Sequence, residues 1–192
     1  MRKITDDTFI RLYRELYSKE FNYIETITEY QFVVRLLIDY LQPKTVLHYG
    51  CGRGALIRRL PDIYPKVFFY GYDPSIRGYD EIVIKNADLI ICDALEHITA
   101  NLLSDVLEHI STISKNAFFV LDHALSDTAL PDGQNVHCTV RPLVWYQIEI
   151  MKAFGEAITI LPGYEPHSSC VATFPLHPHI IKEYHEIIKK DK

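Results

Sequence analysis

The stretch that most constrains the fold is a short apolar run that ends in alternating glycines. The run covers residues 46–49, and Gly50, Gly52 and Gly54 follow it. A helical pattern of apolar residues begins directly afterwards, so the stretch predicts a strand, a tight turn and a helix N-terminus. Glycine permits positive φ and close approach of a ligand to the backbone, and the first turn of a helix offers unpaired N–H groups. The turn is therefore predicted to bind a ligand that carries a nucleotide or a carboxylate.

Two classes of cofactor fit these glycines equally well. Gly50, Gly52 and Ala55 match the G-x-G-x-x-G/A fingerprint of dinucleotide-binding turns. Gly50, Gly52 and Gly54 match the G-x-G-x-G turn of proteins that bind S-adenosylmethionine (SAM). A strand-to-helix turn without any ligand has the same pattern, so the rest of the chain has to separate these alternatives.

An acidic residue follows the second apolar run. That run covers residues 67–72 and ends in Asp73 and Pro74, and Asp73 lies 23 positions after Gly50. An acid at the carboxyl end of the second parallel strand can accept hydrogen bonds from both hydroxyls of a ribose. An aspartate before a proline can also simply begin a turn. Because the glycines precede it, we favour the ribose-binding role.

The remaining pattern is typical of an α/β protein. Apolar runs bounded by turn formers predict strands at 45–49, 67–72, 87–93, 117–121, 156–161 and 169–174, with a short one at 82–84. Helical periodicity predicts helices at about 54–60, 100–114, 141–155 and 178–190. The continuous apolar run at 87–93 suits a central parallel strand. We therefore expect a Rossmann-like, doubly wound, mostly parallel sheet with a C-terminal antiparallel hairpin.

Two further helices are predicted before the first strand. The first, 7–18, has an apolar stripe that includes Phe9 and Tyr13, and the second begins near Thr26 or Thr28 and ends at Gln42. These helices could pack over the glycine turn as a lid or pack on the sheet and complete its core. We expect a single domain, with 1–42 as a helical cap, 44–176 as the Rossmann-like core and 177–192 as a tail helix.

Composition and charge exclude several classes of protein. The chain of 192 residues is 48% hydrophobic and 23% charged, as expected of a globular domain. A net charge of −5 gives no basic field for duplex nucleic acid. No apolar run approaches the roughly 18 residues that a membrane-spanning helix needs. The four widely spaced cysteines predict reduced thiols and a cytoplasmic location.

Taken together, the motifs resemble the class I SAM-dependent methyltransferases, and in particular small bacterial and phage-type members with a shortened third-strand region. The resemblance rests on residues 46–54, on 71–75 and on 88–98, where the sequence Asp-Ala-Leu-Glu-His-Ile at 93–98 is unusual for dehydrogenases. It covers about 45 to 125. The polar segment 130–137, which precedes a helix bearing Trp145, extends it to about 155.

The resemblance implies SAM as the cofactor and a set of residues that bind it. These residues are His48, Gly50, Gly52, Gly54, Asp73, Pro74, Asp93 and Ala94. The glycines would pass close to the methionine part of SAM, Asp73 would hold the ribose, and Asp93 with the residues after it would line the methyl-transfer side. The family usually has an acid at the position of His48, where it helps to hold the methionine ammonium. A protonated histidine would repel that group, so SAM affinity would be lowered, pH-dependent or absent.

Methyl transfer from a sulfonium is an in-line displacement, so an enzyme mainly aligns the two reactants and excludes water. A general base is needed only if the nucleophile must lose a proton. His97, His137 and Asp93 are the candidates, because each is predicted near the carboxyl ends of strands or in the loop over them. His97 could equally be a structural loop histidine, whereas a functional role is favoured for His137, because the polar turn at 132–135 before it is hard to explain by packing. Trp145 and Tyr146 could stack on a planar acceptor or belong to the core.

A metal site is not predicted. His97, His123, His137 and Cys138 could meet in space, but their spacing matches no zinc pattern.

Three hypotheses for function follow. The preferred one is SAM-dependent methyl transfer to an oxygen or nitrogen of a small-molecule or exposed acceptor, among which a nucleotide, a sugar and a peptide side chain stay open. The second is a catalytically inactive SAM-fold binding or scaffold protein, which His48 and the short 75–86 stretch favour. The third is an NAD-dependent oxidoreductase, although no substrate domain is recognisable. We expect a small-molecule partner and no membrane, and the oligomeric state is not predicted.

Overall fold

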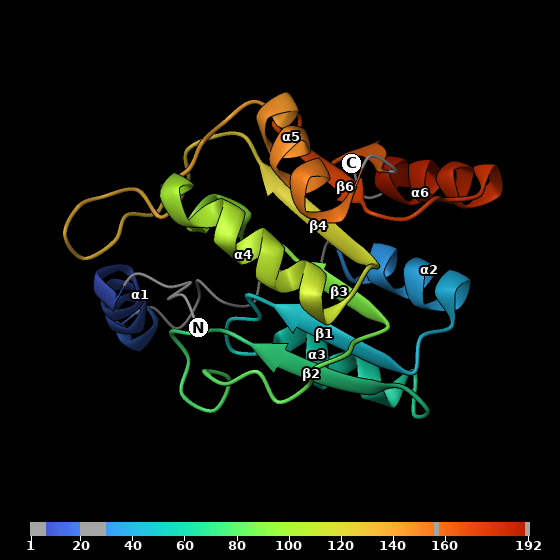
Figure 1. Ribbon diagram of the computed structural model, residues 1–192, viewed down its shortest axis with the longest axis horizontal. Coiled ribbons are helices and arrows are strands. Elements are labelled where there is room, and N and C mark those ends of the chain that lie inside the picture. The colour runs from blue at the N-terminus through green and yellow to red at the C-terminus, as the bar shows by residue number, and fades with distance from the viewer. Residues whose placement is uncertain (1–6, 20–29, 156–157, 191–192) are drawn as a thin grey trace.

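The computed structural model describes residues 7–19, 30–155 and 158–190, and within them six strands form one sheet (Figure 1). The strand order is β2-β1-β3-β4-β6-β5. The parallel strands are β1 (Thr45–Tyr49), β2 (Phe68–Tyr72), β3 (Leu89–Cys92) and β4 (Ala117–Asp122). An antiparallel hairpin of β5 (Thr159–Pro162) and β6 (Ser168–Ala172) completes the sheet through β4. The predicted α/β class, with a mostly parallel sheet and a C-terminal hairpin, is confirmed.

Helices cover both faces of this sheet. One face carries α2 (Gln31–Leu41), α3 (Ala55–Arg59) and α6 (Pro178–Lys190), and the other carries α4 (Ala100–Ile113) and α5 (Leu143–Phe154) (Figure 1). Side chains along each strand alternate between the two resulting cores; for example, Val46 belongs to one and Leu47 to the other. All four residues of β3 are buried. A strand with no face in water reads as a continuous apolar run, which is why the 87–93 stretch predicts it correctly.

The two N-terminal helices take different positions, so both of the proposed roles occur. The first, α1 (Asp7–Lys19), lies beyond the carboxyl ends of β1 and β2 (Figure 1). Its Leu12, Tyr13 and Leu16 pack against Leu130 and Val136 of the loop that precedes α5, in a cluster of their own. The second helix, α2, belongs to the sheet core. One helix is therefore a wall over the sheet ends, and the other completes the core.

The C-terminal end of α2 is the end that can be compared with the prediction. The predicted start near Thr26 or Thr28 lies outside the described residues. The helix ends as predicted at Gln42, which has a left-handed backbone (φ 49°) and donates its N–H to the carbonyl oxygen of Ile38. This is a common way to end a helix before a proline.

The predicted strand at 82–84 is wrong. Residues 73–88 contain no strand, and Val83 is 71% exposed. A parallel neighbour of β2 would need a crossover of about a dozen residues or more, and residues 73–81 are too few to provide it.

The helix predicted at 54–60 differs slightly from the observed one. The observed helix ends at Arg59, and a 3-10 turn, η3 (Leu60–Asp62), then includes Pro61.

All four cysteines are free thiols; Cys51, Cys92 and Cys170 are buried and Cys138 is half-buried. The prediction of unpaired cysteines is confirmed. Every helix among the described residues is too short or too polar to cross a bilayer.

The turn after β1 requires glycine at position 50 for two reasons. The backbone there has φ +83°, and a Cβ would lie 2.4 Å from the Cβ of Ala94, just after β3. The N–H groups of Gly50 and Cys51 both donate to the carbonyl oxygen of Tyr72 at the end of β2. The carboxyl ends of β1, β2 and β3 are therefore held together by this one turn.

The energetic cost of a side chain at position 50 can be measured by comparison with Gly133. There φ is +87°, but a Cβ would meet nothing within 4 Å. We expect Gly133→Ala to lower the free energy of unfolding by about 1–2 kcal/mol, the cost of a left-handed backbone for alanine. Gly50→Ala should lower it by about 1–3 kcal/mol more, because the added methyl overpacks against Ala94. Urea unfolding of both variants tests this, and equal losses would contradict the contact with Ala94.

Candidate functional site

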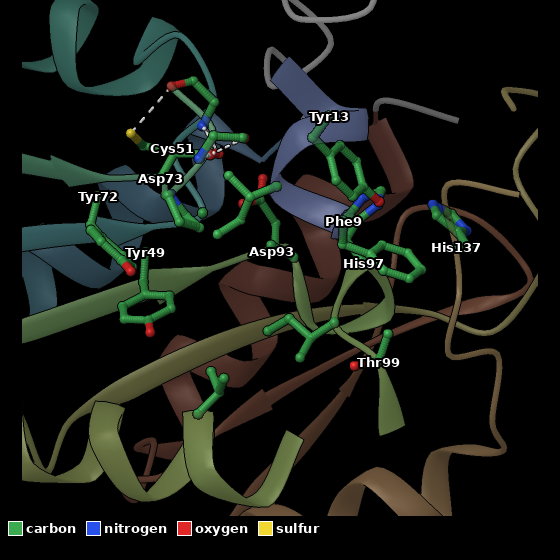
Figure 2. A pocket seen from close by; sticks show the side chains of 18 of the residues that line it. Phe9, Tyr13, Tyr49, Cys51, Tyr72, Asp73, Asp93, His97, Thr99 and His137 are labelled. Atoms are coloured by element: carbon green, nitrogen blue, oxygen red, sulfur yellow. Dashed lines mark hydrogen bonds between the residues drawn. The ribbon is translucent and has the colours of Figure 1, made fainter. Parts of the chain in front are cut away.

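A cavity of about 440 Å³ opens at the carboxyl ends of the parallel strands (Figure 2). Its lining comes from the glycine turn, the end of β2, the 3-10 turn η4 (Leu95–His97) that follows β3, and the loop after β4. The side chains of Phe9, Tyr13 and Tyr17 on α1 form an aromatic wall on one side. The volume falls within the range of about 300–1,000 Å³ that is usual for small-molecule and cofactor sites.

Most of the residues predicted for the site line this cavity. They are Gly50, Gly52, Asp73, Pro74, Asp93, Ala94, His97 and His137. His48 and Gly54 are not among the lining residues. Gly54 precedes α3 with φ +75°, and a Cβ there would lie 2.6 Å from the Tyr79 hydroxyl. Its backbone therefore serves the turn and the start of the helix, away from the cavity.

Asp73 lies at the rim of the glycine turn and is tied to it. Its Oδ2 accepts a hydrogen bond from the Gly52 N–H at 3.0 Å, and its Oδ1 accepts from the N–H and the hydroxyl of Ser75. Burial raises the pKa of the Asp73 carboxyl, and the three hydrogen bonds oppose that rise. They leave about one of the four lone-pair positions of the carboxylate for a ligand.

His48 lies behind the cavity and contacts Asp93 instead of a ligand. Its side chain is fully buried, and its Nε2 is 2.8 Å from Asp93 Oδ1. In the β1–β3 ladder His48 pairs with Ile91, so the side chain at 48 is close to the residue that follows β3. The Asp93 carboxylate accepts from Nε2–H, and Nδ1 has no hydrogen-bond partner among the described residues. His48 therefore orients Asp93, and the expected contact of His48 with the cofactor is not supported.

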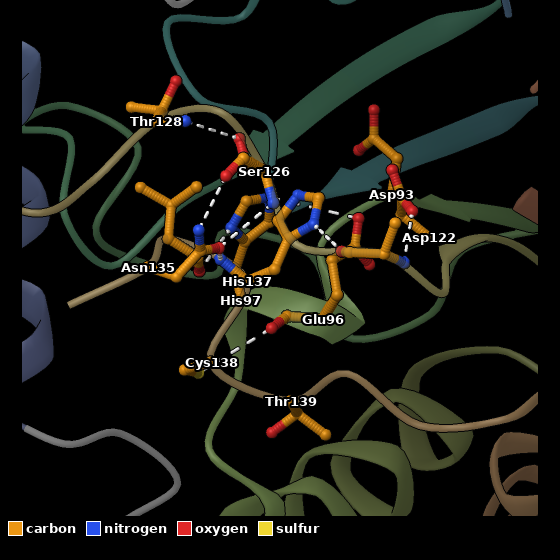
Figure 3. A network of polar contacts seen from close by, with 12 residues as sticks. Asp93, Glu96, His97, Asp122, Ser126, Thr128, Asn135, His137, Cys138 and Thr139 are labelled. Atoms are coloured by element: carbon orange, nitrogen blue, oxygen red, sulfur yellow. Dashed lines mark hydrogen bonds and ion pairs between the residues drawn. The ribbon is translucent and has the colours of Figure 1, made fainter. Parts of the chain in front are cut away.

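Glu96, His97 and His137 come together at the other end of the cavity (Figure 3). One ligand atom from each lies within 4.8 Å of the others, and the two imidazole rings meet edge to face, with their centroids 4.8 Å apart. Burial, followed by the neighbouring Asp93 and Asp122, raises the pKa of the Glu96 carboxyl well above its usual range. Burial, followed by His137, lowers the pKa of His97 to about 4. We call these three residues the Glu96 cluster.

The polar segment before α5 places His137. Asn135 Oδ1 accepts from the N–H groups of Ser126 and His137, and Asn135 Nδ2 donates to the carbonyl oxygen of Ser126. The Tyr13 hydroxyl on α1 donates to the carbonyl oxygen of Val136 at 2.6 Å. These contacts explain a stretch that packing alone does not account for. They also connect the aromatic wall to the loop.

Sequence reasoning misplaced some residues and missed others. Trp145 and Tyr146 do not stack over the cavity, because Tyr146 is fully buried in the core and Trp145 packs edge-on against it. Of the residues considered together for a metal, His97 and His137 meet, while the His123 ring donates to the Arg141 carbonyl oxygen. Glu96 was missed, although it lies in the same motif as Asp93 and His97. The 3-10 turn brings its carboxyl group close to His97, and the sequence pattern does not predict that turn.

Comparison with known proteins identifies the fold. No protein-family model and no curated protein sequence matches the chain. Among solved structures, the chain is similar to the mitomycin 7-O-methyltransferase MmcR, with 16% identity and a TM-score of 0.58 over 83% of this chain and 56% of that one. It is also similar to human N-acetylserotonin methyltransferase in complex with SAM, with 15% identity and a TM-score of 0.55 over 88% and 55%.

A third neighbour is the N-terminal domain of EvdMO1 with S-adenosylhomocysteine (SAH) bound, at 12% identity and a TM-score of 0.53 over 90% and 97%. The chain spans little more than half the length of the first two neighbours. These likenesses show that it has the fold of the class I SAM-dependent methyltransferases.

The pairing of His48 with Asp93 predicts that an acid at position 48 is harmful. His48→Asp would place a second carboxylate at a fully buried position beside Asp93, and we expect it to lower the free energy of unfolding by about 3–5 kcal/mol. His185→Asp, on the exposed face of α6, makes the same chemical change and should stay within about 1 kcal/mol of the wild type. Urea unfolding of the two variants measures the difference. An unchanged His48→Asp variant would show that the buried pair is not important for folding.

Proposed function

We propose that this protein transfers the methyl group of SAM to an oxygen or nitrogen atom of a small-molecule acceptor. The observation that carries the proposal is one cavity with two chemically different ends. The Gly50–Gly52 turn and Asp73 form one end, and Asp93, with the histidines of the Glu96 cluster, forms the other. The structural neighbours support the proposal, because several are O-methyltransferases and three are described with SAM or SAH.

In this proposal the methionine part of SAM lies over the glycine turn, where positive φ at Gly50 and Gly52 opens the backbone to a ligand. The ribose hydroxyls donate to Asp73, as an acid at the end of the second strand commonly allows. Only about one lone-pair position of Asp73 is available. A second ribose hydroxyl would therefore displace the hydroxyl of Ser75, which can rotate away. Pro74 and Ala94 complete the walls on this side.

The acceptor is proposed to lie between the aromatic wall of α1 and the carboxyl end of β3. Phe9, Tyr13 and Tyr17 suit an apolar or planar acceptor, because aromatic side chains stack on such groups. During transfer the S–CH₃ bond of the sulfonium breaks as the bond to the acceptor forms. A proton lost from the acceptor would pass to Asp93, His97 or His137. These three residues stay our candidates for that role.

The other hypotheses have weaker support. An inactive scaffold was favoured by His48, but this side chain faces Asp93 and not the cavity. The oxidoreductase hypothesis rests only on the match of Gly50, Gly52 and Ala55 to a dinucleotide turn.

We also propose that 1–192 form one methyltransferase-like domain, with 1–42 as the cap, 44–176 as the core and 177–192 as the tail helix. The packing of α2 and α6 into one core cluster with the sheet supports a single domain.

Calorimetric titration with SAM and SAH tests the proposal. We expect both to bind the wild type, and we expect Asp73→Asn to raise the dissociation constant of each by about tenfold or more. A hydrogen bond to a charged group contributes about 1.5–3 kcal/mol, and each 1.4 kcal/mol is about tenfold in affinity. Asp80→Asn is the matched control, because Asp80 is exposed in the same loop and does not line the cavity. No binding of either ligand to the wild type at millimolar concentration would exclude the proposed function.

A further inference from the structure

The two histidines of the Glu96 cluster each offer an unprotonated ring nitrogen. His97 Nδ1 is 3.1 Å from the carbonyl oxygen of Val136, and His137 Nδ1 is 2.7 Å from the carbonyl oxygen of Ala124. A carbonyl oxygen can only accept, so each Nδ1 carries the proton of its ring. Both Nε2 atoms therefore have a free lone pair. The Tyr13 hydroxyl, 3.0 Å from His97 Nδ1, donates to Val136 and so agrees with this tautomer.

Glu96 adds a third side chain with an acceptor atom that makes no hydrogen bond to the described residues. Its residue is only 5% exposed, and its Oε2 has no hydrogen-bond partner within the part of the chain that the structure describes. Its Oε1 is 4.0 Å from His97 Nε2, too long for a hydrogen bond. The backbone N–H groups of Glu96 and Asp122 act on this carboxyl as hydrogen-bond donors, and the carboxylates of Asp93 and Asp122 make its surroundings more negative. Buried carboxylates are normally paired with a cation or coordinate a metal.

We propose that Glu96, His97 and His137 bind a divalent cation of the first transition row, such as Mn²⁺ or Zn²⁺. Two imidazole nitrogens and one carboxylate oxygen are a donor set that such ions prefer, and three protein ligands leave positions open for water or substrate. The carbonyl contacts of both Nδ1 atoms are those by which metal-binding histidines are commonly oriented.

The distances allow an ion with small adjustments. Metal–ligand bonds of about 2.0–2.2 Å place neighbouring ligand atoms about 3–3.6 Å apart. The three ligand atoms lie within 4.8 Å of one another, and Glu96 Oε1 is 4.0 Å from His97 Nε2. The side chains would therefore move closer together around an ion. His97 and His137 line the cavity, and Glu96 does not, so the ion would be reached from the acceptor end.

The role of the ion rests on the proposed function and narrows its substrate class. A hydroxyl bound to a divalent cation loses its proton more readily. With both imidazoles bound to the ion, His97 and His137 would no longer be available as the base. The proton would pass to Asp93 or to water, and the oxygen would attack the methyl carbon of SAM. The C–O bond forms as the C–S bond breaks, and SAH leaves. A protonated amine would be repelled by the cation, so the acceptor atom would be an oxygen.

Titration of the full chain with Mn²⁺, followed by calorimetry and by the electron paramagnetic resonance signal of the free ion, tests the site. We expect about one ion per chain. Glu96→Gln and His137→Gln should each weaken binding by at least about tenfold, since removing even an outer-shell partner can cost that much. His185→Gln, which removes a histidine from the exposed face of α6, is the matched control and should bind as the wild type does. Thermal unfolding without the ion verifies that each variant is folded.

Two results would overturn the proposal: no binding of Mn²⁺ or Zn²⁺ to the wild type at millimolar concentration, or equal binding by both cluster variants. Glu96→Gln keeps the shape of a buried side chain, and His137→Gln changes a half-buried loop residue, so one of them serves if the other fails to fold. Titration of the same samples with SAM separates the two proposals. SAM binding without metal binding removes only the metal site, and metal binding without SAM binding removes only the proposed function.

Discussion

The hydrogen bond between His48 Nε2 and Asp93 Oδ1 joins the neighbouring strands β1 and β3 where both end. Directly beside it, the backbone of Gly50 approaches Ala94 more closely than any side chain would permit. These two contacts fix the turn after β1 relative to the turn after β3. The cavity lies between those turns, so its shape depends on a buried polar pair and on one missing Cβ. The residue at position 48 therefore acts first on the structure. It can influence a bound ligand only by way of its contact with Asp93.

The two ends of the cavity are built in different ways. At the glycine turn the ligand would meet backbone, and the sequence that shapes it is short and local. At the acceptor end the groups are side chains from a 3-10 turn, from a loop after β4 and from α1. Each of these segments is held by contacts with another, as Asn135 holds His137 and Tyr13 holds Val136. The proposed acceptor end therefore depends on contacts among three segments, whereas the proposed cofactor end depends on one short turn.

Much of the fold could be predicted because its signals are local. The buried strand β3 is a continuous apolar run, and Gln42 and Gly155 mark helix ends by their backbone conformation. The strand at 82–84 could not be judged from its own residues, since what prevents it is the short connection to β2. The partner of His48 and the position of Glu96 depend on strand register and on a 3-10 turn. These are properties of the assembled sheet, and no spacing in the sequence reports them.

The packing of α1 has a consequence for how this protein can evolve. Leu12, Tyr13 and Leu16 pack with Leu130 and Val136 in a cluster that shares no member with the two cores of the sheet. Substitutions in this cluster are thus not constrained by the packing that maintains the fold. The wall that is proposed to face the acceptor and the scaffold that holds the strands are therefore separate targets for selection. A lineage could exchange one acceptor for another by altering the first helix and one loop, at little cost to the stability of the sheet.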